Sequence, residues 1–332
     1  MTKYDVYGVG NALVDIEFEV TPEQLSDLNI DKGAMTLVDE LRQAEIVRAL
    51  GSQESNRGSG GSAANSVIAV SQFGGRAFYS CHVADDEMGH FYVEDLRRAG
   101  VDTGIETHRM AKGVTGKCLV LVTPDADRTM ITFLGASANI SAADVDESAI
   151  ADSEFAYVEG YLVTGSKSNE AALFAVDRAR SHGTKVAFSL SDQFIVEHFR
   201  PAVDALIGDG VDMPFANEQE AKSVARTEEL DQAIEFLTKI AKQFVVTCGP
   251  DGAVVYDGQS RQKISAVPTQ AIDTVGAGDM FAGAFLYGIT QGMSHIQSGG
   301  LASLAASRIV SSMGPRLTLE DVQAVLKAFS QD

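Results

Sequence analysis

The stretch that decides the fold is DTVGAGD at residues 273–279, a turn of small residues that leads directly into the apolar segment 280–286. Free backbone N–H groups at a helix N-terminus, with the peptide dipoles aligned behind them, form an anion site. Glycines let a phosphate approach that backbone closely. We therefore predict that Gly276, Ala277 and Gly278 hold a transferring phosphoryl group. Asp279, in the first turn, would accept the proton of an attacking hydroxyl. The alternative is a tight turn in which Asp279 only complements the helix dipole.

Two common nucleotide-binding patterns are absent from the sequence. There is no GxxxxGK[ST] string, and GVGNAL at residues 8–13 lacks the third glycine of the dinucleotide fingerprint. Any phosphate must therefore be held by residues 273–279 together with other local groups.

Short β-rich runs alternate with helical stretches along most of the chain, which is typical of an α/β fold with a largely parallel sheet. A helix is expected at residues 63–73, between two glycine pairs, and two late apolar helices at 280–289 and 301–311. A first strand is predicted at residues 4–9, ending in GVG at 8–10. Four further core strands, each expected to lead into a loop and then a helix, are residues 155–158, 185–190, 212–216 and 244–247.

Extended segments with turn chemistry interrupt this alternation. Gly113 and the hairpin-like PDAD at residues 124–127 supply the turns. We interpret these segments as a small β-rich lid inserted twice into the α/β body. The extended segments are residues 16–20, 34–38, 116–123 and 128–134. The predicted core comprises residues 1–14, 58–104 and 136–332, and the predicted lid residues 15–57 and 105–135.

Charge and composition exclude several classes of function. A formal net charge of −20 over 332 residues argues against nucleic acid or an anionic membrane as a partner. Cys81, Cys118 and Cys248 lack metal-ligand spacing and are expected to be buried apolar side chains. No secretory signal is visible, and no apolar run approaches the ~20 residues that span a bilayer. We therefore expect a cytoplasmic protein.

Two motifs carry a resemblance to a known family. DTVGAGD at residues 273–279 resembles the C-terminal signature of the ribokinase-like (PfkB) carbohydrate kinases, and GGSAANS at 60–66 resembles their N-terminal signature. The resemblance covers essentially the whole chain. It implies a three-layer α/β/α core with the ATP site, a β-rich lid, and ATP and Mg²⁺ as donor and cofactor. It leaves open a monovalent cation such as K⁺ beside Asp273.

The resemblance also implies which residues hold the acceptor. Asp15 and Asn65 would bind sugar hydroxyls with the backbone of Gly60 and Gly61, because a carboxylate accepts hydrogen bonds from two vicinal hydroxyls. A solvated strand end is the alternative for Asp15, and an early-helix polar residue for Asn65. Arg128 would be a lid cation over the phosphoryl group, or else a solvent-facing hairpin arginine. Asn11 and Asn139 complete the predicted acceptor contacts.

A second group of residues is implied for ATP. Asn217 and Glu220, in NEQE at residues 217–220, would order the water shell of Mg²⁺, with Glu220 acting through water. The same spacing also fits a helix capping box. TCGPDG at 247–252 matches the family's phosphate loop, although such a turn is common. The remaining predicted ATP contacts are Thr247, Gly249, Gly252, Thr274 and Ser303.

Several strings resemble adenosine kinases more than ribokinases or fructokinases. These are GVGNALVDI at residues 8–16, the segment 128–139, and SLSDQF at 189–194, in which Ser189 departs from the group's asparagine. An apolar slot for a purine base is then expected. Core packing is the alternative for every slot residue. The predicted slot residues are Leu37, Tyr161, Leu162 and Phe194.

The predicted function is transfer of the ATP γ-phosphoryl group to a primary hydroxyl, with adenosine converted to AMP. Another ribonucleoside, or a free sugar such as ribose, fructose or a keto-deoxy sugar acid, is the alternative. A catalytically idle nucleoside-binding protein is a different class of hypothesis, and the intact Asp279 argues against it. The predicted partners are small molecules, and the sequence allows a monomer or a homodimer.

Overall fold

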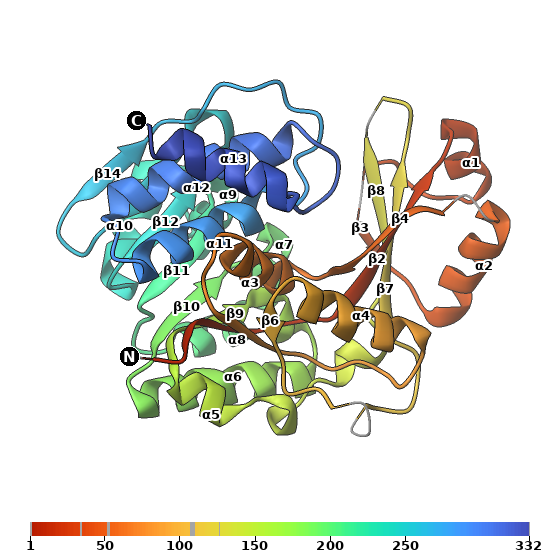
Figure 1. Cartoon of the computed structure of the whole chain (residues 1–332), viewed down its shortest axis with the longest axis horizontal. Coiled ribbons are helices and arrows are strands. Elements are labelled where there is room, and N and C mark those ends of the chain that lie inside the picture. The colour runs from red at the N-terminus through yellow and green to blue at the C-terminus, as the bar shows by residue number, and fades with distance from the viewer. Residues whose placement is uncertain (1, 34, 52–53, 107–109, 126, 332) are drawn as a thin grey trace.

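The computed structural model describes residues 2–33, 35–51, 54–106, 110–125 and 127–331. Within them a nine-stranded sheet has the order β14-β13-β12-β11-β10-β9-β1-β5-β6 (Figure 1). Strands β12 to β6 run parallel, and β13 and β14 are antiparallel. The strand β1 (Tyr4–Val9), between β9 and β5, is buried throughout, as expected when both faces of a parallel sheet are covered. The other strands are β5 (Ala77–Ser80), β6 (Val101–Asp102), β9 (Ser153–Glu159), β10 (Lys185–Ser189), β11 (Met213–Asn217), β12 (Phe244–Thr247), β13 (Ala253–Tyr256) and β14 (Arg261–Ile264).

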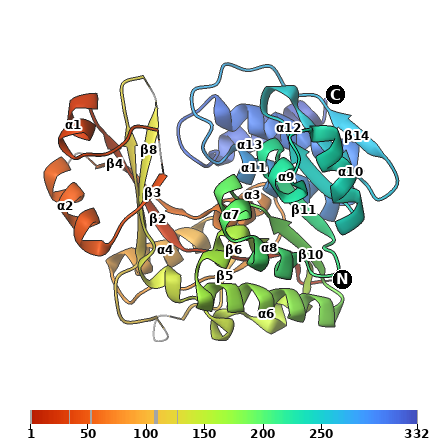
Figure 2. The same ribbon diagram turned by 180° about the vertical axis from the view of Figure 1, so that it is seen from behind.

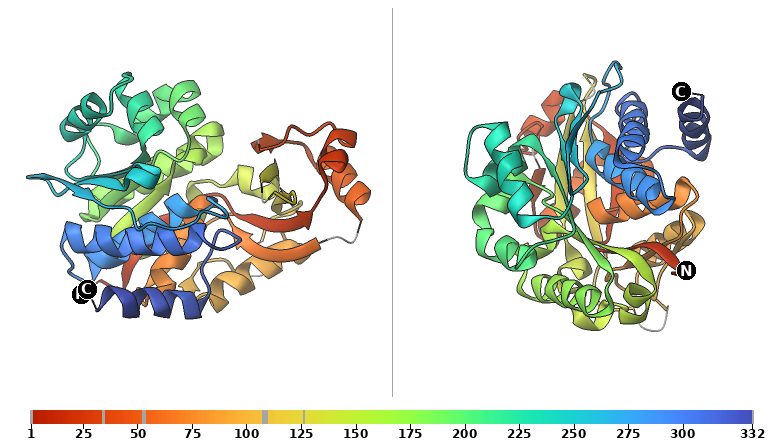
Figure 3. Two further views of the ribbon diagram at one scale, coloured as in Figure 1. Left: turned by 90° about the horizontal axis from the view of Figure 1, so that it is seen from above. Right: turned by 90° about the vertical axis from the view of Figure 1, so that its left-hand side faces the viewer.

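Helices cover both faces of this sheet, so the core has three layers (Figure 3). Each layer of helices buries its apolar side chains in a separate cluster against the sheet. No helix within the described ranges combines the length and apolar character needed to cross a bilayer. One face carries α3 (Ser62–Gln72), α4 (Glu87–Arg98), α11 (Ala277–Thr290), α12 (His295–Val310) and α13 (Leu319–Phe329). The other carries α5 (Glu147–Ala151), α6 (Ser166–His182), α7 (Gln193–His198), α8 (Arg200–Ile207), α9 (Glu218–Ala225) and α10 (Leu230–Ile240).

A second sheet of five strands stands beside the core, as seen from both sides in Figures 1 and 2. Its order is β3-β8-β7-β2-β4. Burial alternates along β2, so Val14, Ile16 and Phe18 lie on one face and Asp15 and Glu17 on the other. Apolar residues of α1 (Pro22–Asp27) and α2 (Glu40–Leu50) join the cluster of the buried face. The strands are β2 (Leu13–Glu19), β3 (Met35–Leu37), β4 (Glu54–Gly60), β7 (Gly116–Val122) and β8 (Arg128–Phe133).

The predicted fold class is confirmed, with two local corrections. The strand at 244–247 was expected to lead into a helix, but β12 turns back through Gly252 into the antiparallel β13. The helix expected at 301–311 begins six residues earlier, at His295, because Ser294 and Gln297 form a capping box there. Position 34 of the predicted segment 34–38 and position 126 of the predicted turn lie outside the described residues.

Two of the four predicted boundaries between core and lid fall inside strands of the smaller sheet. β2 begins at Leu13, before the predicted boundary at 14/15, and β4 continues to Gly60, beyond the one at 57/58. The chain therefore enters and leaves the five-stranded sheet at the residues that the sequence assigns to the acceptor. That this sheet moves as a lid stays a prediction.

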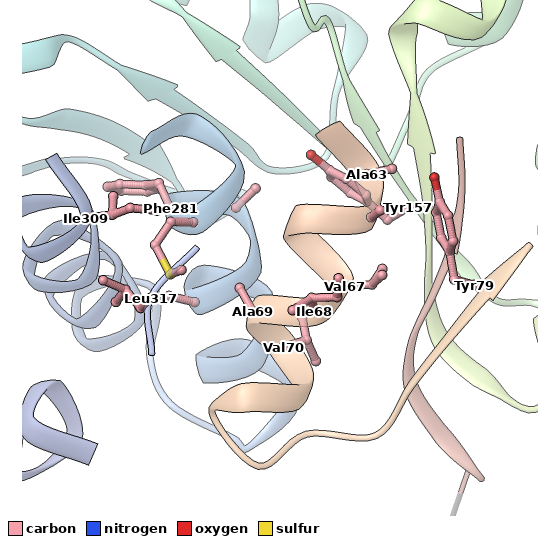
Figure 4. Packing of buried hydrophobic residues seen from close by; sticks show 14 of the residues in the cluster. Ala63, Val67, Ile68, Ala69, Val70, Tyr79, Tyr157, Phe281, Ile309 and Leu317 are labelled. Atoms are coloured by element: carbon pink, nitrogen blue, oxygen red, sulfur yellow. The ribbon is translucent and has the colours of Figure 1, made fainter. Parts of the chain in front are cut away.

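Helices α3 and α11 pack closely against each other in the core (Figure 4). Small residues allow this approach: a Cβ at Gly283 would lie 2.4 Å from the Ser66 carbonyl oxygen and 2.6 Å from the Ala69 Cβ. Asp279 lies one turn before Gly283, and residues four apart share a face of a helix. The contact at Gly283 therefore sets how near Asp279 comes to α3.

We predict that Gly283→Ala lowers the free energy of unfolding. Overpacking typically costs about 1–3 kcal/mol, and the higher helix propensity of alanine returns at most about 1 kcal/mol. Gly278→Ala on the same helix is the matched control, because a Cβ at Gly278 meets no atom within 4 Å. Urea unfolding of both variants measures the difference. Equal stability of the two would contradict the proposed close packing.

Candidate active site

The turn before α11 has the geometry expected of an anion site. Gly276 is the N-cap residue with φ +75°, a left-handed conformation that favours glycine, and no side chain caps the helix. Pro315 packs behind it, since a Cβ at Gly276 would lie 2.7 Å from the Pro315 carbonyl oxygen. On the other side Gly276 and Gly278 line a pocket. Ala277 N donates to the Thr274 carbonyl oxygen at 3.3 Å. The N–H groups of Gly276 and Gly278, the two residues of this turn that line the pocket, are the ones available to a ligand there.

Asp279 lines the same pocket, where two side chains of α3 hold its carboxylate. Ser62 Oγ donates to Oδ1 at 2.7 Å, and Asn65 Nδ2 donates to Oδ2 at 3.2 Å. Burial raises the pKa of Asp279 to about 6, and these two hydrogen bonds oppose the rise. The carboxylate is thus oriented, and it titrates near neutral pH, as a general base requires.

The predicted acceptor residues meet where β4 ends and α3 begins. A Cβ at Gly60 would lie 2.2 Å from Asp15 Oδ2, and a Cβ at Gly61 would lie 2.2 Å from the Asn11 carbonyl oxygen. Both positions therefore exclude any side chain. Burial raises the pKa of Asp15 to about 7, and the nearby charge of Arg316 opposes that rise. The structure brings Asp15, Gly60, Gly61 and Asn65 together beside Asp279.

Asn217 and Glu220, at the start of α9, line the same pocket. They form the capping box expected from NEQE, with Glu220 N donating to Asn217 Oδ1 at 2.9 Å and Asn217 N to Glu220 Oε2 at 2.9 Å. Burial raises the pKa of Glu220 to about 7. No cluster of three His, Cys, Asp or Glu ligands exists among the described residues. Glu220 lines the pocket with a carboxylate, the oxygen ligand type that suits a hydrated Mg²⁺. That it orders the water shell of Mg²⁺ stays a prediction.

The other predicted ATP residues occupy different environments. Thr247 lines the pocket at the end of β12. Gly249 has φ +55° and open space at its Cβ position, whereas a Cβ at Gly252 would lie 2.0 Å from the Ile264 carbonyl oxygen. Ser303 is buried, and its hydroxyl donates to the Ser265 carbonyl at 2.9 Å. Thr274 is exposed. Their contacts with ATP stay predictions.

Arg128 joins the five-stranded sheet to the phosphate turn. Its side chain is 4% exposed, with Nη1 3.3 Å from Glu17 Oε1 and Nη2 3.0 Å from Asp273 Oδ2. Asp273 also accepts from the backbone N–H groups of Val275 and Gly314, both at 3.0 Å. The alternative that Arg128 is a solvent-facing hairpin arginine is therefore wrong. A direct role in catalysis stays a prediction, because Arg128 is engaged beside the turn and does not line the pocket.

The predicted purine slot is divided between exposed and buried residues. Phe194 on α7 and Leu37 on β3 are each 56% exposed, which is unusual for large apolar side chains. Helix α7 lies on the side of the core that faces the five-stranded sheet (Figure 2). Leu162 has no exposed surface and packs in the core, so it cannot line an open slot. For Leu162 the alternative of core packing is correct.

Two predicted acceptor asparagines lie apart from the pocket. Asn11 is buried, donates through Nδ2 to Glu159 at 2.7 Å and accepts from Ser137 at 3.1 Å. Its side chain thus supports the turn between β1 and β2. Asn139 is exposed at the end of a short 3-10 helix, Gly135–Asn139.

Comparison with known proteins identifies the family. A model of the pfkB family of carbohydrate kinases matches residues 38–322. The chain belongs to this family. It is therefore a PfkB kinase, an enzyme whose acceptor group is a hydroxyl.

Individual PfkB proteins differ in their acceptors. A probable sugar kinase from Rhizobium etli is 36% identical, with a TM-score of 0.90 over 99% of both chains. An adenosine kinase from Sinorhizobium meliloti is also 36% identical, with a TM-score of 0.89 over 98% of this chain and 99% of its own. The 5-dehydro-2-deoxygluconokinase of Geobacillus kaustophilus is 27% identical over 267 residues, covering 76% of this chain and 79% of its own.

Sequence reasoning did not assign three residues of this PfkB site. Ser62 stands within the N-terminal signature itself, so its position was a usable signal. Glu159 follows a predicted strand, and strand ends in parallel sheets point toward such sites. Its carboxylate accepts from Ala63 N at 3.0 Å and from Asn11, and thus ties α3 to the turn after β1. Arg316 stands in an irregular loop, and no local pattern marks it.

We predict that kcat/KM falls as the pH drops through the pKa of Asp279, about 6, because a protonated base cannot accept the hydroxyl proton. Ser62→Ala removes a donor that favours the ionised form, so the acid limb of the pH profile should move to higher pH. Ser66→Ala is the matched control on α3, since Ser66 Oγ contacts the Ser62 carbonyl and Tyr157. Identical acid limbs for Ser62→Ala and the unmodified enzyme would contradict the assigned hydrogen bond.

Proposed function

We propose that the chain transfers the γ-phosphoryl group of ATP to a primary hydroxyl of a ribonucleoside, with adenosine as the substrate. The observation that carries this proposal is the position of Asp279. It lies between Asp15 and Asn65, which suit sugar hydroxyls, and a pocket that reaches Asn217, Glu220 and Thr247. A base between an acceptor site and a phosphate site is the arrangement that in-line transfer requires.

In the proposed reaction the acceptor oxygen attacks the γ-phosphorus of ATP. The new O–P bond forms as the bond to the β–γ bridging oxygen breaks, and ADP leaves. The hydroxyl proton passes to the Asp279 carboxylate, while the N–H groups at residues 276–278 stabilise charge on the equatorial oxygens. Mg²⁺, when bound near Glu220, would supply further positive charge at the phosphates. The five-stranded sheet, closing as a lid, would exclude the water that otherwise hydrolyses ATP.

Two observations support a nucleoside acceptor. Phe194 on α7 of the core and Leu37 on β3 of the five-stranded sheet offer exposed apolar surface, and aromatic rings stack well on purines. The similarity to the adenosine kinase of Sinorhizobium meliloti covers almost the whole chain. A free sugar is the second candidate, because 5-dehydro-2-deoxygluconokinases are among the sequence relatives and a probable sugar kinase is equally similar in structure.

We predict that adenosine supports faster Mg²⁺-dependent ATP consumption than inosine, guanosine, cytidine, ribose, fructose or 2-keto-3-deoxygluconate. Asp279→Asn should lower kcat by about 10²–10⁴-fold, the usual contribution of a general base. Thermal shift with adenosine tests whether that variant still binds. Unchanged turnover by Asp279→Asn would refute the assigned base. Preference for a free sugar would refute only the nucleoside acceptor.

We predict that Phe194→Ala raises KM for adenosine roughly tenfold and leaves KM for ATP unchanged. Loss of base stacking costs about 1–3 kcal/mol, and each 1.4 kcal/mol is tenfold in affinity. Leu319→Ala is the control, since Leu319 is 64% exposed on α13, away from the pocket. Steady-state kinetics with both substrates measures the effect. An unchanged KM for adenosine would remove Phe194 from the acceptor site.

A further inference from the structure

Arg316 has no role in the chemistry described above, yet its side chain contacts three elements of the site. It stands in the loop between α12 and α13, with its side chain 19% exposed. Its Nε donates to Asn65 Oδ1 at 3.2 Å, Nη1 to Asp95 Oδ2 at 3.0 Å and Nη2 to Ser59 Oγ at 2.8 Å. The planar guanidinium thus spans α3, α4 and β4 with a fixed set of donors.

The contact with Asn65 determines which way the amide points. A guanidinium only donates hydrogen bonds, and an ionised carboxylate only accepts them. Asn65 lies between Arg316 and Asp279, so a single amide orientation satisfies both neighbours. Oδ1 faces Arg316, and Nδ2 then donates to Asp279 Oδ2 at 3.2 Å. Without Arg316 only Asp279 constrains the amide, because a flipped Nδ2 no longer meets a guanidinium.

The backbone around Arg316 is fixed by the same segments that form the site. Gly314 N donates to Asp273 Oδ2 at 3.0 Å, and Gln72 Nε2 on α3 donates to the Leu317 carbonyl at 2.9 Å. Pro315 packs against Gly276. The loop is therefore attached to both the phosphate turn and α3, which gives Arg316 a defined position relative to Asp279.

The charge of Arg316 also acts on Asp15. Arg316 Nη2 donates to Ser59 Oγ on β4, and the next residue, Gly60, lies against Asp15, since a Cβ there would be 2.2 Å from Asp15 Oδ2. Burial raises the pKa of Asp15, and the charge of Arg316 opposes that rise. Asp15 binds two hydroxyls best when it is ionised, because only the carboxylate accepts through both oxygens. A permanent positive charge beside it favours that form near neutral pH.

We propose that Arg316 is a positioning residue for phosphoryl transfer: it orients the Asn65 amide toward the Asp279 carboxylate and places positive charge beside Asp15. The proposal rests on the proposed function, because it takes Asp279 as the base and Asp15 as the residue that binds the hydroxyls of the substrate. It does not depend on which base or sugar the acceptor carries.

The test compares Arg316→Gln, Arg316→Lys and the control Arg308→Gln, using the acceptor that the substrate panel selects. Arg308, on the exposed surface of the preceding helix, pairs with Asp321. Arg308→Gln therefore also removes a paired arginine, but away from the site. For Arg316→Gln we expect a roughly ten- to hundredfold loss of kcat, as for other misplaced catalytic groups. The acceptor KM should rise, and the ATP KM should stay unchanged.

The pH profile separates positioning from simple destabilisation. In Arg316→Gln the acid limb of kcat/KM should move to higher pH, because Asp279 loses an oriented donor and Asp15 loses a nearby cation. Arg316→Lys retains the positive charge but loses the planar set of guanidinium N–H donors. The acceptor KM should therefore recover while kcat stays low. The other titratable groups around Asp279 are unchanged in all variants: Tyr157 and Glu159 on β9, Tyr161 after it and Glu220 on α9.

Three results would overturn the proposal. They are an unchanged kcat in Arg316→Gln, an acid limb that does not move, and full recovery of kcat in Arg316→Lys. A lower melting temperature with normal kinetics would likewise reduce Arg316 to a structural residue. Failure of the proposed function gives a different signature, namely normal turnover by Asp279→Asn with every acceptor.

Discussion

The close approach of α11 to α3 is the constraint on which the site depends. Gly283 has no side chain, and its backbone lies where a Cβ would be 2.4 Å from the Ser66 carbonyl. One turn earlier on the same face, Asp279 meets Ser62 and Asn65. The helix contact therefore brings Asp279, the end of β4 and the turn at residues 276–278 into one place. Burial of Asp279 at this point raises the pKa of its carboxyl.

Burial of acids recurs throughout the site of this very acidic chain. Asp15, Glu159, Glu220 and Asp279 all have a pKa raised to about 6 or 7, and burial is the largest cause in each. Backbone N–H groups, amides and a hydroxyl solvate the carboxyls of Glu159, Glu220 and Asp279 in place of water. With a net charge of −20, an anionic ligand must be attracted by local groups and not by the overall field. The N–H groups at the start of α11 are a local feature of this kind. Their attraction for an anion does not depend on the charge of the protein surface.

The sequence was sufficient for those parts of the molecule that local rules determine. Strands 4–9 and 244–247 match β1 and β12, because their apolar runs are bounded by turn residues. The capping box of Asn217 and Glu220 and the open turn at 276–278 also follow from local spacing. Leu162 was misjudged because an apolar residue beside a site looks the same in sequence whether it faces the ligand or the core. Arg316 could not be found because its partners, Ser59, Asn65 and Asp95, are more than 200 residues away along the chain.

The loop that carries Arg316 connects the five-stranded sheet to the residues around Asp279. Through Gly314 N it reaches Asp273, whose carboxylate also pairs with Arg128 of the five-stranded sheet. Through Arg316 it reaches Asn65 and, beyond it, Asp279. A movement of the sheet that displaces Arg128 changes the partners of Asp273, and Asp273 holds both the phosphate turn and this loop. Hydrogen bonds and one buried ion pair therefore link the position of the five-stranded sheet to that of Asp279. Asp273 is the member they share, because a shift of its carboxylate alters both the phosphate turn and the loop that carries Arg316.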